Sequence, residues 1–289
     1  MRLAIFADDP DWHCRRLVAA ATRQGAEVVV TSLRRCRFRL GGDGSGIEIP
    51  GFGGALPDVA FVRNIPSGSF EQVTFRLSIL HGLRELGIRV VNDARAIERC
   101  VDKSMTSFLL HKAGIPTPET LVGEDGDAAA SWRALQKSDV IAKPLFGAQG
   151  RGLRRIAPVN PLPDPADPAL SGVLYLQRYV GRASEWRDFR VFVIGDRAVA
   201  AMMRRGKSWV TNVARGGTCE RAPSDGRLAE LAVAAARAVG ADYCGVDLIE
   251  DARRGLAVLE VNSMPAWRGL QGVAETDIAD SIARHVLAR

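Results

Sequence analysis

Strands and helices alternate along the first third of this 289-residue chain, and this alternation constrains its fold more than any other feature. Four apolar or β-branched runs predict strands, at residues 3–8, 27–33, 59–64 and 89–92. Helical patterns occupy residues 12–24 and 70–86. Because strands that alternate with helices form mainly parallel sheets, we expect an open α/β domain over residues 1–98. The segment 41–54 holds seven glycines and is expected to be an irregular loop.

The pattern changes after this first domain. Helices are expected at residues 103–113, 127–137, 226–239 and 278–288. Strands are expected at residues 119–122, 140–145, 173–180, 189–195 and 199–205, and a hairpin at 245–250 and 256–262. A proline-rich stretch at residues 158–168 indicates a surface connector. These elements predict a central domain over residues 99–175 and a C-terminal domain over residues 176–289, of mixed α/β and α+β type.

Composition argues against several classes of protein. Charged residues make up 25% of the chain and hydrophobic residues 47%, which is ordinary for a globular protein and too apolar for a disordered one. No run approaches the ~20 apolar residues of a membrane-spanning helix, so we expect no membrane partner. The net charge of +6 suits anionic substrates, and the spread of arginines along the chain argues against nucleic acid. Five cysteines without a CxxC pair favour a reducing cytoplasm.

A glycine-rich loop follows one of the predicted central strands. Residues 141–153 read IAKPLFGAQGRGL, with Lys143 at the entrance to the loop. Free backbone N–H groups and a lysine can together hold phosphate oxygens. A Walker loop or a dinucleotide-binding loop would open a helix, whereas LRRIA after this loop has the pattern of a strand. We therefore predict a β-hairpin that folds over a triphosphate, although an ordinary glycine hairpin would give the same pattern.

Acidic and amide side chains lie together on the predicted C-terminal hairpin. Asp247 lies in its first strand, and Glu260 and Asn262 are two residues apart in the second, so they project from one face. Oxygen ligands without histidine or thiolate are typical of a Mg²⁺ or Mn²⁺ site that bridges phosphates. The alternative is the solvated face of an edge strand. The apolar run LAVL before Glu260 indicates a buried strand and favours the metal site.

Together these motifs resemble the ATP-grasp superfamily, and most closely the RimK-like α-L-glutamate ligases, which add glutamates to a ribosomal protein or to small carboxylates. The resemblance rests on Lys103, Lys143 with GAQGRG, DFR at 188–190, Asp247, and EVN at 260–262. It extends from about residue 89 to the C-terminus. It implies an ATP-grasp fold behind an N-terminal α/β domain. It also implies a ligase that uses ATP and two Mg²⁺ (or Mn²⁺) ions to convert a carboxylate to an acyl phosphate and join it to an amine.

The resemblance implies roles for single residues as well. Lys103 and Lys143 would contact the nucleotide phosphates, and Asp188 would contact the ribose or the metal–phosphate region. The other nucleotide-binding candidates are Gly147, Gln149, Gly150, Gly152, Gln177, Arg178, Tyr179, Val180, Arg205 and Asn212. The catalytic candidates are Lys143, Arg190, Lys207 and Arg215, with Arg190 expected to stabilise the transferring phosphate. The implied metal ligands are Asp247, Glu260 and Asn262.

Two positions depart from the family pattern. Arg178 stands where relatives often carry glutamate, although backbone groups of residues 177–180 can still bind adenine. Val210 stands where the ligases that modify ribosomal protein carry a basic residue, and this difference argues against that acceptor.

Candidate substrate residues follow the metal ligands in the chain. Arg268 suits bidentate binding of a carboxylate, and Trp267 offers a flat surface for a ring. A Trp-Arg pair that only stabilises a loop is the alternative. Arg63 is another candidate for an anionic substrate, with a simple surface arginine as its alternative.

The segments around these three residues resemble the RimK-like ligases of the tetrahydromethanopterin and methanofuran cofactor pathways. This resemblance implies L-glutamate as the amine and a small carboxylate, such as a one-carbon cofactor precursor, as its partner. A glutamate ligase for a ribosomal-protein tail, a dipeptide or amino-acid ligase, and a catalytically idle ATP-binding scaffold stay open as alternatives. We also expect a homo-oligomer, either a dimer or a tetramer.

Overall fold

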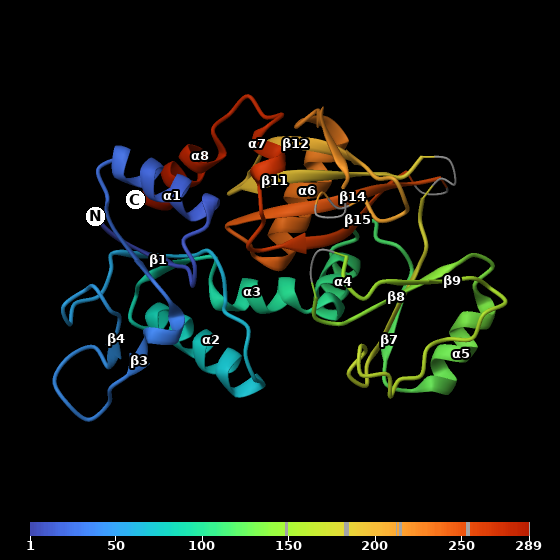
Figure 1. Cartoon of the computed structure of the whole chain (residues 1–289), viewed down its shortest axis with the longest axis horizontal. Coiled ribbons are helices and arrows are strands. Elements are labelled where there is room, and N and C mark those ends of the chain that lie inside the picture. Colours follow the sequence, from blue (N-terminus) through green and yellow to red (C-terminus); the bar gives the residue numbers. More distant parts are fainter. Residues whose placement is uncertain (148–149, 182–184, 212, 214–215, 253–254, 289) are drawn as a thin grey trace.

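Three main sheets, each formed by one stretch of the chain, make up the computed structural model (Figure 1). The structure describes the chain except residues 148–149, 182–184, 212, 214–215, 253–254 and 289. The N-terminal and C-terminal sheets lie next to each other, and the central sheet lies beyond the C-terminal one (Figure 1). Within the described residues, no helix has both the length and the apolar character needed to cross a membrane.

The N-terminal sheet is fully parallel, as the alternation of strands and helices predicted. Its order is β2-β1-β5-β6, formed by Glu27–Thr31, Arg2–Phe6, Val59–Val62 and Arg89–Val91. Its helices are α1 (Trp12–Arg23), α2 (Phe70–Glu85) and α3 (Ala94–Val101), with a short 3₁₀ turn η1 (Leu33–Arg35). The segment expected as an irregular loop differs from expectation, because β4 (Ile47–Glu48) pairs there with β3 (Arg37–Phe38). The helix α3 was not predicted.

The central sheet is antiparallel and carries the glycine-rich loop. Its order is β7-β10-β8-β9, formed by Thr120–Gly123, Leu174–Arg178, Val140–Lys143 and Arg154–Ile156. The helix α4 (Lys103–Lys112) precedes it, and α5 (Gly126–Leu135) packs on it through Ala129. Because β8 and β9 pair directly, the predicted strand–loop–strand hairpin is confirmed.

The C-terminal sheet has the order β13-β12-β11-β14-β15. Its strands in chain order are β11 (Arg187–Ile194), β12 (Arg197–Arg205), β13 (Thr218–Ala222), β14 (Tyr243–Asp251) and β15 (Gly255–Asn262). Its helices are α6 (Gly226–Val239), α7 (Arg268–Gln271) and α8 (Ile278–Leu287). The predicted hairpin is therefore β14–β15, whereas β13 and α7 were not predicted.

Packing decides which face of the C-terminal sheet is free for chemistry. Val246 and Leu248 of β14 pack in one core with α6. Since alternate side chains of a strand point to opposite faces, Asp247 projects to the other side. Another core joins the N-terminal sheet to the C-terminal sheet, with Phe61 stacked on Tyr243 at 4.9 Å between ring centroids.

Candidate active site

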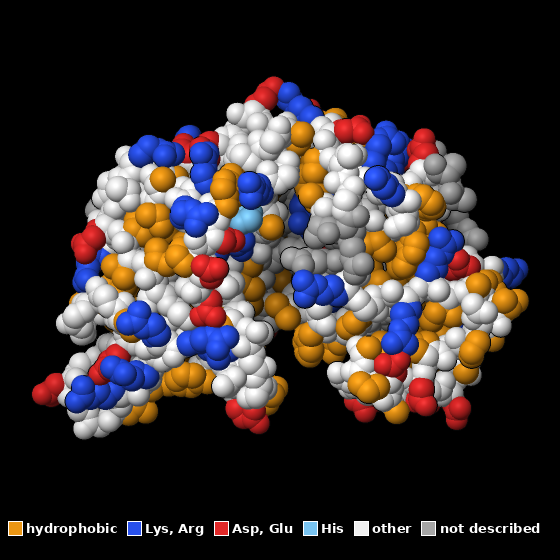
Figure 2. Space-filling view, in the orientation of Figure 1, with side chains coloured by type: hydrophobic (Ala, Val, Ile, Leu, Met, Phe, Trp, Pro, Cys, Tyr) orange, Lys and Arg blue, Asp and Glu red, His pale blue; other side chains and the backbone are white. Residues whose placement is uncertain are grey.

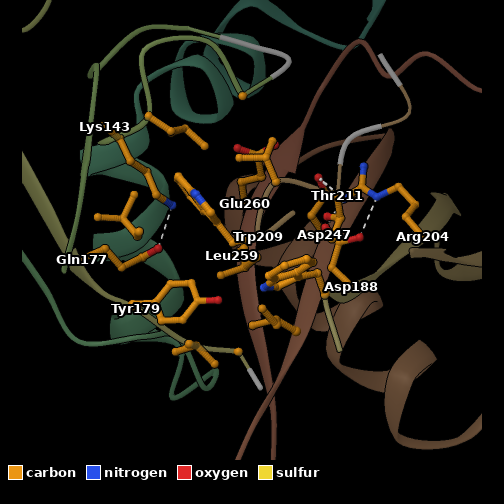
Figure 3. Close-up of a pocket in the computed structure, with 18 of the residues that line it drawn as sticks. Lys143, Gln177, Tyr179, Asp188, Arg204, Trp209, Thr211, Asp247, Leu259 and Glu260 are labelled. Carbon is orange, nitrogen blue, oxygen red and sulfur yellow. Dashed lines mark hydrogen bonds and ion pairs between the residues drawn. The ribbon is translucent and has the colours of Figure 1, made fainter. Parts of the chain in front are cut away.

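A pocket lies between the central and C-terminal sheets (Figure 3). Lys143 of β8, Gln177 of β10 and Tyr179, which directly follows β10, project into it. The opposite wall carries acidic and basic side chains of the C-terminal sheet, namely Asp188, Arg204, Asp247 and Glu260. Gly147 and Gly150 of the glycine-rich loop also line the pocket, so the loop and the predicted acidic ligands belong to one site.

A network of buried ion pairs forms the C-terminal wall. Arg190 Nε and Nη2 donate to the two carboxylate oxygens of Asp247, each at 2.7 Å. Arg204 donates to both oxygens of Asp188, at 2.8 and 2.5 Å, and its Nη2 lies 3.0 Å from Asp247 Oδ2. These residues meet because Asp188 pairs with Arg204, and Arg190 with Asp247, across neighbouring antiparallel strands.

The network keeps Asp247 ionised at neutral pH. Although burial acts in the opposite direction, Arg190 and Arg204 hold the pKa of Asp247 well below its usual range. Burial raises the pKa of Asp188, and Asp247 adds to this rise, while Arg204 works against it. Arg204 therefore joins two buried carboxylates that would otherwise repel each other.

The hairpin residues fit a hard divalent cation bound together with phosphate oxygens. Asp247 and Glu260 face each other across β14 and β15. Three guanidinium contacts occupy Asp247, which leaves about one of its roughly four acceptor positions. Among the described residues, Glu260 accepts a hydrogen bond from Asn262 Nδ2 at 3.2 Å, so the amide oxygen of Asn262 points elsewhere. Such a partial oxygen set suits Mg²⁺, which takes one or two carboxylates and otherwise binds phosphate and water.

Both pocket lysines bind protein acceptors that a phosphate could replace. Lys103 Nζ donates to the carbonyl oxygens of Leu145 and Gly147, at 3.3 and 2.9 Å, and so holds the glycine-rich loop. Lys143 Nζ donates to Gln177 Oε1 at 2.7 Å. Burial lowers the pKa of Lys143 to about 8, although Glu260 favours its charged form.

This lowered pKa predicts that nucleotide binding weakens at alkaline pH. Below about pH 8 the free protein carries the charge on Lys143 that attracts phosphate. Above that pH the lysine must first regain a proton, so the dissociation constant of ADP should rise by up to about tenfold per pH unit. Calorimetric titration with ADP from about pH 7 to about pH 9.5 measures this slope. The Lys143→Arg variant keeps its charge and should show a shallower profile, since only Lys103, whose pKa burial also lowers, still titrates there. Equal slopes in both proteins would contradict the assignment.

The far end of the pocket is lined by apolar and aromatic side chains. The rings of Tyr179 and Trp209 meet edge to face with centroids 6.4 Å apart, next to Leu259 (Figure 3). Val180 also lines this end. The Arg178 side chain turns away to a buried ion pair with Asp251, so only its backbone can face a base. This arrangement is compatible with the predicted binding of adenine by backbone groups.

Arg205 differs from the sequence expectation. Its side chain donates to the exposed Glu220 at 2.8 Å, and Arg204 lines the pocket in its place. One residue along a strand reverses the side chain's direction, so Arg205 projects from the opposite face. Lys207 is exposed and does not line the pocket either.

The predicted substrate residues lie elsewhere. Trp267 is 1% exposed, in the core shared by the N-terminal and C-terminal sheets, so its ring cannot serve as a surface for a substrate. Arg63 is largely buried and donates to the carbonyl of Met264 and to Asp11, each at 3.3 Å. The exposed Arg268 lies over the ring of Trp12 at 5.8 Å. None of these three side chains lines the pocket as the structure describes it.

The structure does not bring every predicted nucleotide-binding and catalytic residue to the pocket. Gln149, Asn212 and Arg215 lie outside the described residues. Gly152, with φ of +72°, belongs to the loop but does not line the described pocket. Its backbone requires glycine, because an added Cβ would lie 2.7 Å from Pro144.

Arg204 is the main residue that the sequence motifs did not identify. Its only signal in the sequence was its place in the predicted strand 199–205. The register that puts Arg204 opposite Asp188 is not visible in a single sequence. Trp209 lines the pocket as well.

Comparisons with known proteins place the chain in one family. A model of the RimK-like ATP-grasp domain matches residues 100–286, and a model of the RimK pre-ATP-grasp domain matches residues 1–97. The solved structure of the ATP-grasp ligase PsnB with a minimal precursor, Mg and ADP has a TM-score of 0.73 at 23% identity, over 99% of this chain and 97% of that one. A RimK-domain ATP-grasp protein from Sphaerobacter thermophilus gives 0.71 at 20% identity, with both chains fully covered. These structures share the predicted ATP-grasp fold.

Relatives also match along nearly their whole lengths. The tetrahydromethanopterin:alpha-L-glutamate ligase of Methanococcus maripaludis is 32% identical over 296 residues, which cover 99% of this chain and 98% of the relative. A probable alpha-L-glutamate ligase of Xanthomonas oryzae is 33% identical over 293 residues, covering 99% and 97%. Two adjoining family models and relatives of this similarity lead to one conclusion: the chain belongs to the RimK-like ATP-grasp family of ATP-dependent ligases.

Proposed function

We propose that this ATP- and Mg²⁺-dependent ligase adds L-glutamate to a small carboxylate, such as a one-carbon cofactor precursor of the tetrahydromethanopterin or methanofuran type. The observation that carries the proposal is the full-length similarity to ligases named for tetrahydromethanopterin and glutamate. The pocket supports it chemically, because Lys103 and Lys143 face the carboxylates of Asp247 and Glu260 across a space suited to a triphosphate.

The charges of the site suggest how its residues act. Lys103 and Lys143 bind and orient the phosphates, and Glu260 and Asn262, with the remaining acceptor position of Asp247, hold Mg²⁺. When bound, the cation would neutralise charge on the transferring phosphate. Attack by the substrate carboxylate on the γ-phosphate, with ADP as the leaving group, brings two anions together. Arg190 does not line the described pocket but pairs with Asp247, and through this pair it would offset the negative charge at the site. The amine of glutamate then displaces phosphate from the acyl phosphate.

Mass spectrometry tests this proposal directly. The protein is incubated with ATP, Mg²⁺, glutamate and each candidate carboxylate, and ADP release is followed in parallel. We expect the carboxylate to gain the mass of a glutamyl residue, with one ADP released per residue added. Omission of glutamate is the control. Equal ADP release without glutamate, or addition of another amino acid in its place, would contradict the choice of amine.

Two other classes of function have less support. An idle ATP-binding scaffold would not need Lys143, Asp247 and Glu260 together in one pocket. A nucleic-acid partner would favour a continuous basic surface, and on the face in Figure 2 the Lys and Arg side chains are scattered among acidic ones.

We extend the proposal to the organisation of the protein. Its domains would be residues 1–98, 99–175 and 176–289, and the site would hold two Mg²⁺ (or Mn²⁺) ions. A cytoplasmic homo-oligomer, a dimer or tetramer, is proposed in agreement with five cysteines that are all free thiols. Sedimentation analysis measures the oligomeric state.

A further inference from the structure

The side chain of Asn92 connects the N-terminal sheet to the strands that carry the predicted metal ligands. Asn92 follows β6 directly and is 0% exposed. Its Nδ2 donates to the carbonyl oxygens of Tyr243 and Ser263, at 2.8 and 2.6 Å. Its Oδ1 accepts from the backbone N–H groups of Asp242 and Tyr243, at 2.7 and 3.1 Å. Both amide protons and the carbonyl oxygen are thus fully used, which also determines how the amide is oriented.

The bonded groups lie at one end of the β14–β15 hairpin. Tyr243 is the first residue of β14, and Ser263 follows Asn262, the last residue of β15. The direct pairing of the two strands ends with Gly245 opposite Asn262. Asn92 bonds to Tyr243 of β14 and to Ser263, which follows β15, just beyond this last pair. It therefore fixes the distance between the two strands next to Asn262.

Other contacts from the N-terminal sheet reach the same region. Tyr243 Oη donates to the carbonyl of Val62 at 2.9 Å, and Arg63 Nη1 donates to the carbonyl of Met264 at 3.3 Å. Asn92 is the contact that touches both strands of the hairpin, whereas Tyr243 Oη attaches only β14. Substitutions of Asn92 and of the Tyr243 hydroxyl can therefore distinguish the effects of these two contacts.

We propose that Asn92 is a positioning residue of the metal site, which acts by holding the end of β15 so that Asn262 and Glu260 face the nucleotide phosphates correctly. The inference rests on the proposed metal-binding role of these two residues. It assigns the N-terminal sheet a part in metal binding although that sheet contributes no lining residue to the described pocket. Residues that orient metal ligands from behind typically change metal affinity by about 10- to 100-fold when replaced.

The test compares ADP binding with and without Mg²⁺ in the Asn92→Asp variant. The carboxylate has nearly the same shape, but it places an oxygen against the carbonyls of Tyr243 and Ser263. Calorimetric titration gives the ADP dissociation constant in each condition, and their ratio measures the coupling between metal and nucleotide. We expect binding without Mg²⁺ to stay near the wild-type value, because the lysines and the apolar end of the pocket are unchanged. The tightening by Mg²⁺ should fall about tenfold or more.

Tyr243→Phe is the matched control. It removes a buried hydrogen bond between the same two sheets, so the melting temperature should fall, yet the Mg²⁺ ratio should stay at the wild-type value. If Asn92→Asp does not fold, the milder Asn92→Ser, which keeps one donor and one acceptor, should show a smaller loss of the ratio. A folded Asn92 variant with the full wild-type ratio would overturn the inference.

A third variant separates this inference from the proposed function. Glu260→Gln removes a predicted ligand itself. If Glu260→Gln keeps the full Mg²⁺ effect, the metal assignment is wrong. If Glu260→Gln loses the effect and Asn92→Asp keeps it, only the role of Asn92 is overturned.

Discussion

Glutamine in place of Glu260 is expected to lower the turnover number by about 10³-fold or more while the fold stays intact. Of the two hairpin carboxylates that line the pocket, Glu260 has more unused acceptor positions, because Asp247 already accepts from two arginines. Glutamine keeps the size of the side chain and an oxygen for the bond from Asn262, but it removes the negative charge that attracts a divalent cation. Since Glu260 is only partly buried, the free energy of unfolding should change by less than about 1 kcal/mol.

Steady-state ADP release and thermal denaturation of the same preparations measure these two effects. Glu220→Gln is the matched control, because Glu220 lies in the same sheet and pairs with the exposed Arg205, and neither residue lines the described pocket. This control should keep wild-type turnover. Retained turnover in Glu260→Gln would show that the metal site has been assigned to the wrong residue.

Methionine in place of Arg204 is expected to destabilise the protein strongly. Asp188 and Asp247 are 6% and 3% exposed, and Arg204 is the guanidinium that bonds to both. Its loss leaves Asp188 as a buried charge without its bidentate partner, and removing one member of a buried ion pair typically costs about 3–5 kcal/mol. Arg205→Met changes the adjacent residue in the same way. Because Arg205 forms an exposed pair with Glu220, its loss should cost less than about 1 kcal/mol.

Urea denaturation of both variants measures the difference between the two neighbouring positions. The double variant Arg204→Met, Asp188→Asn removes the unpaired charge together with its partner, so part of the lost stability should return. Similar destabilisation by Arg204→Met and Arg205→Met, or no recovery in the double variant, would contradict the described network.

Much of the fold could be predicted because strand and helix patterns are local. The parallel N-terminal sheet, the β8–β9 hairpin around the glycine-rich loop and the β14–β15 hairpin all agree with the predicted runs. Short elements such as β4 and β13 were missed, because two to five residues carry little periodicity. The predicted substrate residues do not line the pocket. Trp267 was predicted to contact a substrate ring, but the packing of two sheets buries its side chain.

The sequence by itself determined the family, the order of the motifs and the residue types that a phosphate and metal site requires. Only the tertiary structure decided which charged groups become partners. Asp188 and Arg204 are 16 residues apart, Arg190 and Asp247 are 57 apart, and Asn92 bonds to a residue 151 positions away. Ion pairing depends on distance in space and on which face a strand presents. A shift of one residue, such as that between Arg204 and Arg205, therefore separates a buried member of the site from an exposed side chain on the opposite face.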